Sequence, residues 1–97
     1  MYIINNEINS TTDTGLQAGK LLDVNAKEIL HISLEANHEF PKHMSPRDAH
    51  LFVLEGDLIF YIHNLEYRLL KHQIFNFPKD EEHWVKAIQN SKFLIVR

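Results

Sequence analysis

The chain contains no cysteine, and this absence removes three kinds of chemistry together. A disulfide scaffold, a thiolate metal site and a cysteine nucleophile are all excluded. Any functional site must therefore be built from histidine, carboxylate, hydroxyl and backbone groups. Histidine is the abundant member of that set, with seven copies among 97 residues, so imidazole chemistry is the first to consider.

Basic clusters and long hydrophobic runs are missing as well. Ten lysines and arginines face 13 aspartates and glutamates, spread without a block of one sign. Nothing resembles the basic stripe that follows a phosphate backbone, so we expect no nucleic-acid partner. No apolar run approaches the ~20 residues that span a bilayer, and the first ten residues lack the pattern of a signal peptide. We therefore expect a cytoplasmic protein with no membrane partner.

No segment shows a sustained period near 3.6 residues, so we predict little or no helix. Short apolar runs separated by turn residues instead predict an all-β sandwich or barrel. The length suits one domain, and a small β-domain of this kind often buries a further face in a dimer. We therefore expect a homodimer. The predicted strands are residues 2–4, 16–22, 27–34, 51–54, 58–62, 67–70, 74–77, 84–88 and 93–96.

The most informative stretch is residues 41–56, PKHMSPRDAHLFVLEG. It joins a polar loop to a short apolar strand and ends in a glycine turn. His43, Ser45, Asp48 and His50 lie just before the strand, and all four can bind a metal ion or a polar ligand. A polar cluster carried by a loop onto a rigid strand is a common way to build a site.

The order of these residues resembles the small single-domain cupins. The resemblance rests on His43, on the strand end Val-Leu-Glu-Gly at residues 53–56, and on Phe77 and Pro78 followed by His83. It implies one cupin domain over residues 1–97, with N-terminal strands and a loop in residues 1–25 and the barrel in residues 26–97. The implied fold is an antiparallel jelly-roll barrel, or double-stranded β-helix, that is usually dimeric and has a site in its mouth.

The resemblance also implies a metal site, and here the sequence departs from the family pattern. His43 and His83 match two ligand positions. Ser45 stands where the motif has its second histidine, and Ala49 stands where it has glutamate. His72 replaces the glycine that opens the second motif. The metal-binding motif is therefore degenerate.

A third histidine is the remaining candidate ligand. His50 lies one position beyond the expected glutamate, so a regular strand would point it to the opposite face, whereas a bulge near Pro46 would turn it inward. A set formed by His43, His50 and His83 would suit one divalent transition metal, namely Zn, Ni, Fe or Mn. His38 is a further histidine within reach of the same loop.

Two hypotheses stay open at this point. In the first, the barrel binds a small molecule of unknown identity, without catalysis or as a sensor, in a pocket lined by Ser45, Phe52, Phe77 and Trp84. In the second, His43 and His83, with His50, hold a metal that acts on a small molecule. The lost glutamate and histidine favour the first hypothesis. The catalytic residues and the substrate are not derivable from the sequence.

Overall fold

A computed structural model describes residues 2–97 and consists almost entirely of antiparallel strands. The elements are α1 (Glu7–Ser10), β1 (Leu16–Val24), β2 (Lys27–Leu34), β3 (Glu39–His43), β4 (Ala49–Glu55), β5 (Asp57–Ile62), β6 (Leu65–Leu70), β7 (Ile74–Phe77), β8 (His83–Ala87) and β9 (Ser91–Val96). The predicted all-β architecture is confirmed. Within residues 2–97, no helix is long and apolar enough to cross a membrane.

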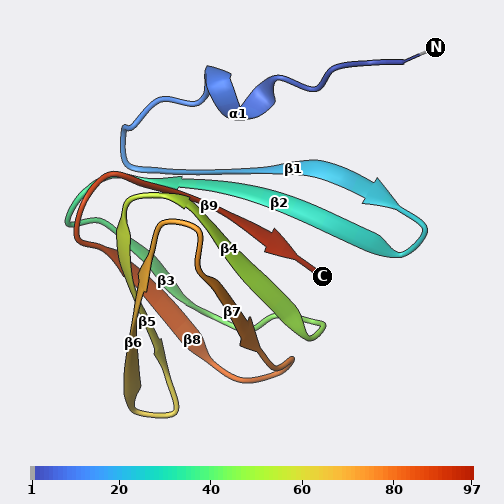
Figure 1. Ribbon diagram of the computed structural model, residues 1–97. Helices are drawn as coiled ribbons and strands as arrows, with labels where there is room; N and C mark the ends of the chain where they lie inside the picture. The colour runs from blue at the N-terminus through green and yellow to red at the C-terminus, as the bar shows by residue number, and fades with distance from the viewer. Residues whose placement is uncertain (1) are drawn as a thin grey trace.

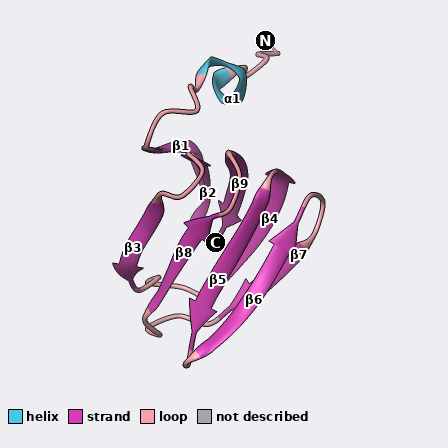
Figure 2. Cartoon of the chain, turned by 90° about the vertical axis from the view of Figure 1, so that its left-hand side faces the viewer, coloured by secondary structure: helices cyan, strands magenta, loops and turns pink. Residues whose placement is uncertain are grey.

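The strands form two sheets that pack face to face as a jelly roll. One sheet has five strands in the order β1-β2-β9-β4-β7, and the other has four in the order β3-β8-β5-β6. Figure 2 shows the four-stranded sheet in front, with β4 and β7 behind it. The short helix α1 lies outside the sheets, above the β1–β2 hairpin (Figure 1). The space between the two sheets holds the core.

Period-two alternation determines which side chains enter that core. Along β4, Ala49, Leu51 and Val53 are buried, whereas His50 and Phe52 between them point outward. The same alternation brings large residues from both sheets into one cluster. Its members are Ile32, Leu34, Ala49, Leu51, Val53, Leu58, Phe60, Ile62, Leu69, Phe77, Val85, Ala87, Phe93 and Ile95.

The barrel has two ends that differ in construction. We call one the closed end, defined by Gly56, Asp57, Arg68 and Ser91, where the chain crosses from β4 in one sheet to β5 in the other. We call the other the open end, defined by His43, Ser45, His83 and Arg97. The register separates them clearly, because Ile62 pairs with His83 at one end of β5 and Asp57 begins the other end.

The strand prediction was wrong at residues 2–4, which form no regular structure and are fully exposed. Three apolar residues without a pairing partner cannot form a ladder, and the polar segment that follows them allows no return strand. The helix α1 falls in that polar segment instead. The other predicted strands occur, most of them with longer bounds than the apolar runs alone suggested.

Sequence reasoning also missed β3, because Pro41 was interpreted as a loop residue. Proline lacks an N–H and is tolerated only where no ladder bond is needed, such as on an edge strand. β3 is the edge strand of its sheet, and its pairing with β8 shifts register between Phe40 and His43, at the proline. The proline therefore marks a bulged edge strand, and that strand carries His43.

One turn and one strand of the fold are informative. The β5–β6 hairpin turns at His63 and Asn64, with φ of 53° and 61° at the two residues. Alternate residues of β2 face opposite sides of its sheet, and His31 and Ser33 on the outer side are nevertheless buried. The N-terminal segment covers them there, since the Ser33 hydroxyl donates to the Thr12 carbonyl at 3.0 Å.

Candidate functional site

Two histidines meet at the open end of the barrel. His43 ends the edge strand β3, His83 begins β8, and the two residues are direct cross-strand partners. Their Nε2 atoms are 3.1 Å apart, and their rings meet edge to face. The structure therefore brings together the two residues that match the metal-ligand positions of the cupin motifs.

The hydrogen bonds of the other ring nitrogens decide what this pair can do. The Nδ1 atom of His43 lies 2.7 Å from the carbonyl of Pro41, and Nδ1 of His83 lies 3.0 Å from the carbonyl of Glu81. A carbonyl only accepts, so each Nδ1 carries a proton and donates it. In the neutral pair both Nε2 lone pairs then converge on the same space. That arrangement suits a shared proton or a cation between the rings.

His83 is enclosed by aromatic side chains and is 2% exposed. Its ring stacks on Phe60 at a centroid distance of 5.1 Å and meets Phe77 edge-on at 4.7 Å. Burial lowers the pKa of His83 below 6.5, and the neighbouring His43 lowers it further, against the raising effect of the Glu81 carbonyl. His43 is half-buried and stacks on Phe40 at 4.4 Å. His83 is therefore held neutral at physiological pH.

The pair opens into a cavity of about 210 Å³ between the two sheets. Its wall is mostly apolar and comes from strands of both sheets, and its few polar groups lie at the open end. The lining residues are Leu30, Ile32, Phe40, His43, Met44, Ser45, Pro46, Leu51, Phe60, Phe77, His83, Val85, Phe93, Ile95 and Arg97. The volume is below the roughly 300–1,000 Å³ of pockets for drug-sized ligands, so the cavity suits a small molecule.

The structure does not bring His50 to this pair. His50 is exposed on the outer face of the five-stranded sheet, opposite Val96 on β9 and Asn76 on β7. The predicted inward turn requires a bulge before His50, but β4 pairs regularly from His50 to Val53 and shifts register only after that. The three-histidine set is therefore not formed. His38 is also elsewhere, paired with Glu35 at 3.2 Å.

The donor set is too small for a resident metal centre. Ser45 and Ala49, which replace the motif's histidine and glutamate, are both buried and supply no imidazole or carboxylate. Within residues 2–97 no group of three or more histidines, aspartates or glutamates converges on one point. Catalytic zinc sites use three protein ligands and structural sites use four, so the residues present do not fit such a metal.

Two of the four predicted pocket residues line the cavity and two do not. Ser45 and Phe77 line it, and both are buried. Phe52 points to the outer face of the five-stranded sheet, because it alternates with the inward Leu51 and Val53. Trp84 alternates with the inward His83 and stacks on Tyr61 outside the barrel, with centroids 3.7 Å apart. Strand parity therefore places these two side chains outside the cavity.

The loops around the open end are tied to one another. The Ser45 hydroxyl donates to the Arg47 carbonyl at 2.6 Å and accepts from the Arg47 N–H at 3.3 Å. The Ser45 carbonyl accepts from the Asp80 N–H at 2.9 Å, and the Asp48 carboxylate accepts from the Lys79 N–H at the same distance. Asp48 therefore joins the β3–β4 loop to the β7–β8 loop.

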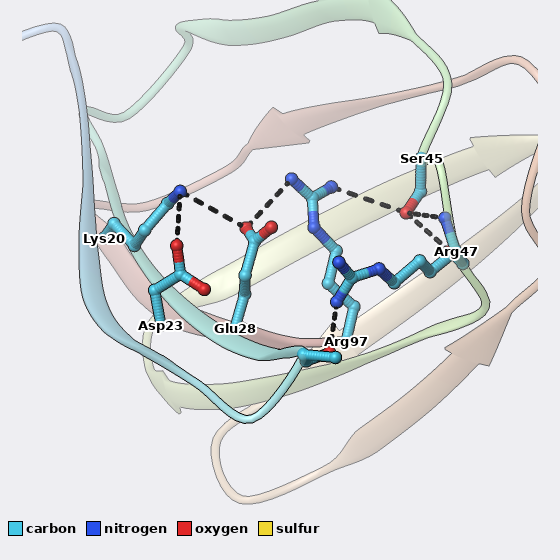
Figure 3. A network of polar contacts seen from close by, with 7 residues as sticks. Lys20, Asp23, Glu28, Ser45, Arg47 and Arg97 are labelled. Atoms are coloured by element: carbon cyan, nitrogen blue, oxygen red, sulfur yellow. Dashed lines mark hydrogen bonds and ion pairs between the residues drawn. The ribbon is translucent and has the colours of Figure 1, made fainter.

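Sequence reasoning missed Arg97. This residue follows β9. Its backbone N–H donates to the Glu28 carbonyl and its carbonyl accepts from the Glu28 N–H. These two bonds hold Arg97 where its side chain lines the cavity. Figure 3 shows its guanidinium between Glu28 and Ser45. No local motif marks such a residue. The only available signal was a lone basic residue directly after an apolar strand.

No protein-family model and no curated protein matches the sequence. Comparison of the fold with solved structures gives clear similarities. A cupin-2 domain protein from Shewanella frigidimarina is 23% identical, with 98% of this chain and 93% of that chain covered at a TM-score of 0.79. An RmlC-like cupin from Desulfovibrio desulfuricans is 18% identical, with 99% and 95% covered at 0.83. A conserved protein of unknown function from Streptococcus pyogenes is 26% identical, with 84% and 71% covered at 0.75.

Proposed function

Because this chain has the fold of a small cupin barrel, we propose that it binds a small molecule in the cavity behind His43 and His83 and does not catalyse a reaction. The single observation that supports this proposal is the composition of the cavity. An apolar wall encloses about 210 Å³, and polar groups gather only at its open end. Apolar pockets with a few convergent polar groups are typical small-molecule sites.

The groups that line the cavity favour binding over catalysis. Among residues 2–97 no carboxylate lines it. Its one hydroxyl, that of Ser45, is engaged with the backbone of Arg47 and has no histidine as a hydrogen-bond partner. A hydroxyl nucleophile needs an adjacent base. No carboxylate orients the histidine pair either, since each Nδ1 donates to a backbone carbonyl.

Ligand-induced stabilisation tests this proposal. A ligand that binds only the folded state raises the midpoint of thermal unfolding as its concentration passes its dissociation constant. We expect several small, mostly apolar compounds to raise that midpoint, and a cavity-filling Val85→Phe variant to reduce the shifts. A library of such compounds that produces no shift at ~5 mM would count against a binding function.

The second candidate function is a metal-dependent enzyme, favoured by one specific observation. The convergent Nε2 atoms of His43 and His83, 3.1 Å apart, are arranged as two ligands of one ion would be. Water would have to complete the coordination of Zn, Ni, Fe or Mn, and two imidazoles hold such ions weakly. Metal analysis decides between the candidates: less than ~0.2 equivalents of any transition metal after gentle purification, and no thermal shift with Zn or Ni, would exclude this second function.

We also propose that the chain forms a homodimer through the outer face of the five-stranded sheet. Ile74, Phe52 and Leu94 are direct cross-strand partners there, on neighbouring strands, and form one apolar row. Val96 on the same face is 38% exposed and Ile74 is 59% exposed. A Phe52→Asp substitution is expected to convert a dimer into a monomer in light scattering. A wild-type chain that is already monomeric at ~100 μM would refute the dimer.

A further inference from the structure

The guanidinium of Arg97 is incompletely satisfied where it lines the cavity. Its Nε is buried and has no hydrogen-bond partner. Its Nη1 lies 3.4 Å from the Ser45 hydroxyl, and its Nη2 lies 3.5 Å from the Glu28 carboxylate. Charge-assisted bonds are usually about 2.7–2.9 Å long. The partners that Arg97 has within the protein are therefore distant, and its side chain is only 18% exposed to water.

Arg97 shares its carboxylate partner with a second cation. Figure 3 shows the network: the Glu28 carboxylate is shared between Arg97 and Lys20, and Lys20 also pairs with Asp23 at 3.3 Å. Arg47 belongs to the same network but donates to the Ala26 carbonyl, outside the cavity. An anion that entered the cavity would find a guanidinium whose carboxylate partner is 3.5 Å away and shared with Lys20.

The rest of the cavity limits what that anion can be. Beyond Arg97 and the engaged Ser45 hydroxyl, its polar side chains are His43 and His83, whose Nδ1 protons are already donated to backbone carbonyls. The remaining wall is aliphatic and aromatic, including Phe60, Phe77 and Phe93. A multiply charged anion would lack partners for its further charges. A single negative group on a compact apolar body matches both parts of the wall.

We propose that the cavity binds a small organic monocarboxylate, with its carboxylate on the Nη groups of Arg97 and its hydrocarbon body against the aromatic wall. This inference rests on the proposed binding function and names the chemical class of its ligand. The planar fork of a guanidinium matches a carboxylate bidentately. The carboxylate replaces the long contact to Ser45, and the apolar body removes the wall from water.

A matched pair of probes isolates the charge. Benzoate and benzamide have nearly the same size and shape, but only benzoate is anionic at neutral pH. Calorimetric titration of the full chain with each compound is expected to show benzoate binding about tenfold or more tightly than benzamide. Arg97→Met is expected to abolish that preference, so that the variant binds benzoate and benzamide about equally. Arg47→Met is the control, because it removes a cation from the same network without touching the cavity.

Each alternative outcome has a definite meaning. Equal affinity for benzoate and benzamide would overturn the carboxylate inference and leave the binding function intact. A benzoate preference that Arg97→Met and Arg47→Met reduce equally would also overturn it, since general charge would then explain the effect. Failure of benzoate, benzamide and toluene to bind at about 10 mM would overturn the binding function itself.

A second variant keeps the test valid if Arg97→Met does not fold. Arg97→Lys retains the charge but loses the planar fork. We expect it to weaken benzoate binding about fivefold and to weaken benzamide binding less. Unaltered benzoate affinity in a folded Arg97→Lys protein would contradict a bidentate carboxylate contact.

Discussion

The two ends of the barrel contain the same kinds of groups and use them differently. At the closed end, Arg68 meets Asp57 with two bonds of 3.0 and 2.5 Å, and the Asp57 N–H donates to the Ser91 hydroxyl at 3.0 Å. At the open end, the Arg97 guanidinium makes only hydrogen bonds of 3.4 and 3.5 Å. One arginine has its hydrogen bonds satisfied within the fold, whereas the other keeps donor capacity free. We therefore expect stability to reside mainly at the closed end, and we propose that ligands bind at the open end.

The closed end is expected to show the largest effect of a single substitution. Gly56 has φ of 103°, and an added Cβ would lie 2.1 Å from the Ser91 hydroxyl and 2.6 Å from its Cα. The backbone of Ser91 cannot move aside without breaking the crossing between the sheets. Gly56→Ala is expected to cost roughly 3 kcal/mol of unfolding free energy or to prevent folding. Denaturant unfolding measures the loss.

Gly19→Ala is the matched control for this experiment. An added Cβ at Gly19 has no atom within 4 Å, so this variant is expected to unfold within about 0.5 kcal/mol of wild type. If the Gly56→Ala protein were as stable as the Gly19→Ala protein, the crossing from β4 to β5 at Gly56 would not be rigid.

The site is proposed to lack metal ligands because Ser45 and Ala49 replace a histidine and a glutamate. Restoring those two ligands tests this explanation. Ser45→His and Ala49→Glu together restore the histidine and glutamate of the cupin motif at two buried positions. The double variant is expected to bind Zn or Ni at least about a hundredfold more tightly than wild type. Without metal it should be less stable, because Ala49→Glu buries an unpaired charge.

Metal titration followed by calorimetry measures the gain in affinity. The single Ser45→His variant is the control and is expected to gain less. A double variant with wild-type affinity would mean that positions 45 and 49 do not converge on the histidine pair.

The ion pair of the closed end is expected to show in the pH dependence of stability. The hydrogen bonds from Arg68, with its charge, hold the pKa of Asp57 below its ordinary value of 3.8. A carboxyl whose pKa is lower in the folded state stabilises the fold above pH 3.8, and that contribution is lost as the pH falls through the folded pKa. Asp57→Asn should therefore flatten the acid side of the stability profile.

At neutral pH, Asp57→Asn is expected to cost about 1.5 kcal/mol, the low end for bonds to a charged group, because solvent screens the exposed Arg68. Urea unfolding between neutral pH and pH 3 compares the two proteins. Parallel profiles for Asp57→Asn and wild type would contradict the assignment of this pair.

The open end should tolerate removal of a polar group. His43→Leu replaces a half-buried ring that contacts Phe40 and His83 with an apolar side chain, and it relieves the convergence of two Nε2 atoms. Groups kept for binding commonly lower the stability of a fold. The unfolding free energy of the variant is therefore expected to differ from that of wild type by less than about 1 kcal/mol. Thermal unfolding gives the value, and a loss as large as that of Gly56→Ala would remove the distinction between the two ends.

The smallest effect is expected for His50→Ala. His50 is exposed on the outer face, away from the cavity, so stability should change by less than about 0.5 kcal/mol. Binding of Zn or Ni should change less than about twofold, as isothermal titration can measure. A large loss of metal affinity would mean that His50 is a metal ligand after all.

The fold was predictable from the sequence, and its site was predictable only in part. Alternation and turn residues identified most strands, since period two is a local signal. The predictions were wrong for residues 2–4 and for β3. In both segments the presence or absence of a partner strand, and not the local sequence, decides the structure. Pro41 shows this clearly: only its place at a sheet edge makes it compatible with a strand.

Within the site, the motif located His43 and His83 but not the direction of their neighbours. Phe52, Trp84 and His50 each lie next to an inward residue and therefore point outward. The motif also did not include Arg97, whose position depends on the pairing of β9 with β2. His72 illustrates the converse: it replaces a motif glycine yet has φ of 70°, so the backbone keeps a conformation that favours glycine.

One measurement tests the division between the two ends most directly, namely chemical-shift mapping of the isotope-labelled chain titrated with benzoate. The amide signals of Ser45, Phe77, His83 and Arg97 are expected to move with one dissociation constant, while those of Asp57 and Ser91 stay in place. Movement concentrated at Asp57 and Ser91, or on the outer face at Phe52 and Leu94, would contradict a binding cavity at the open end.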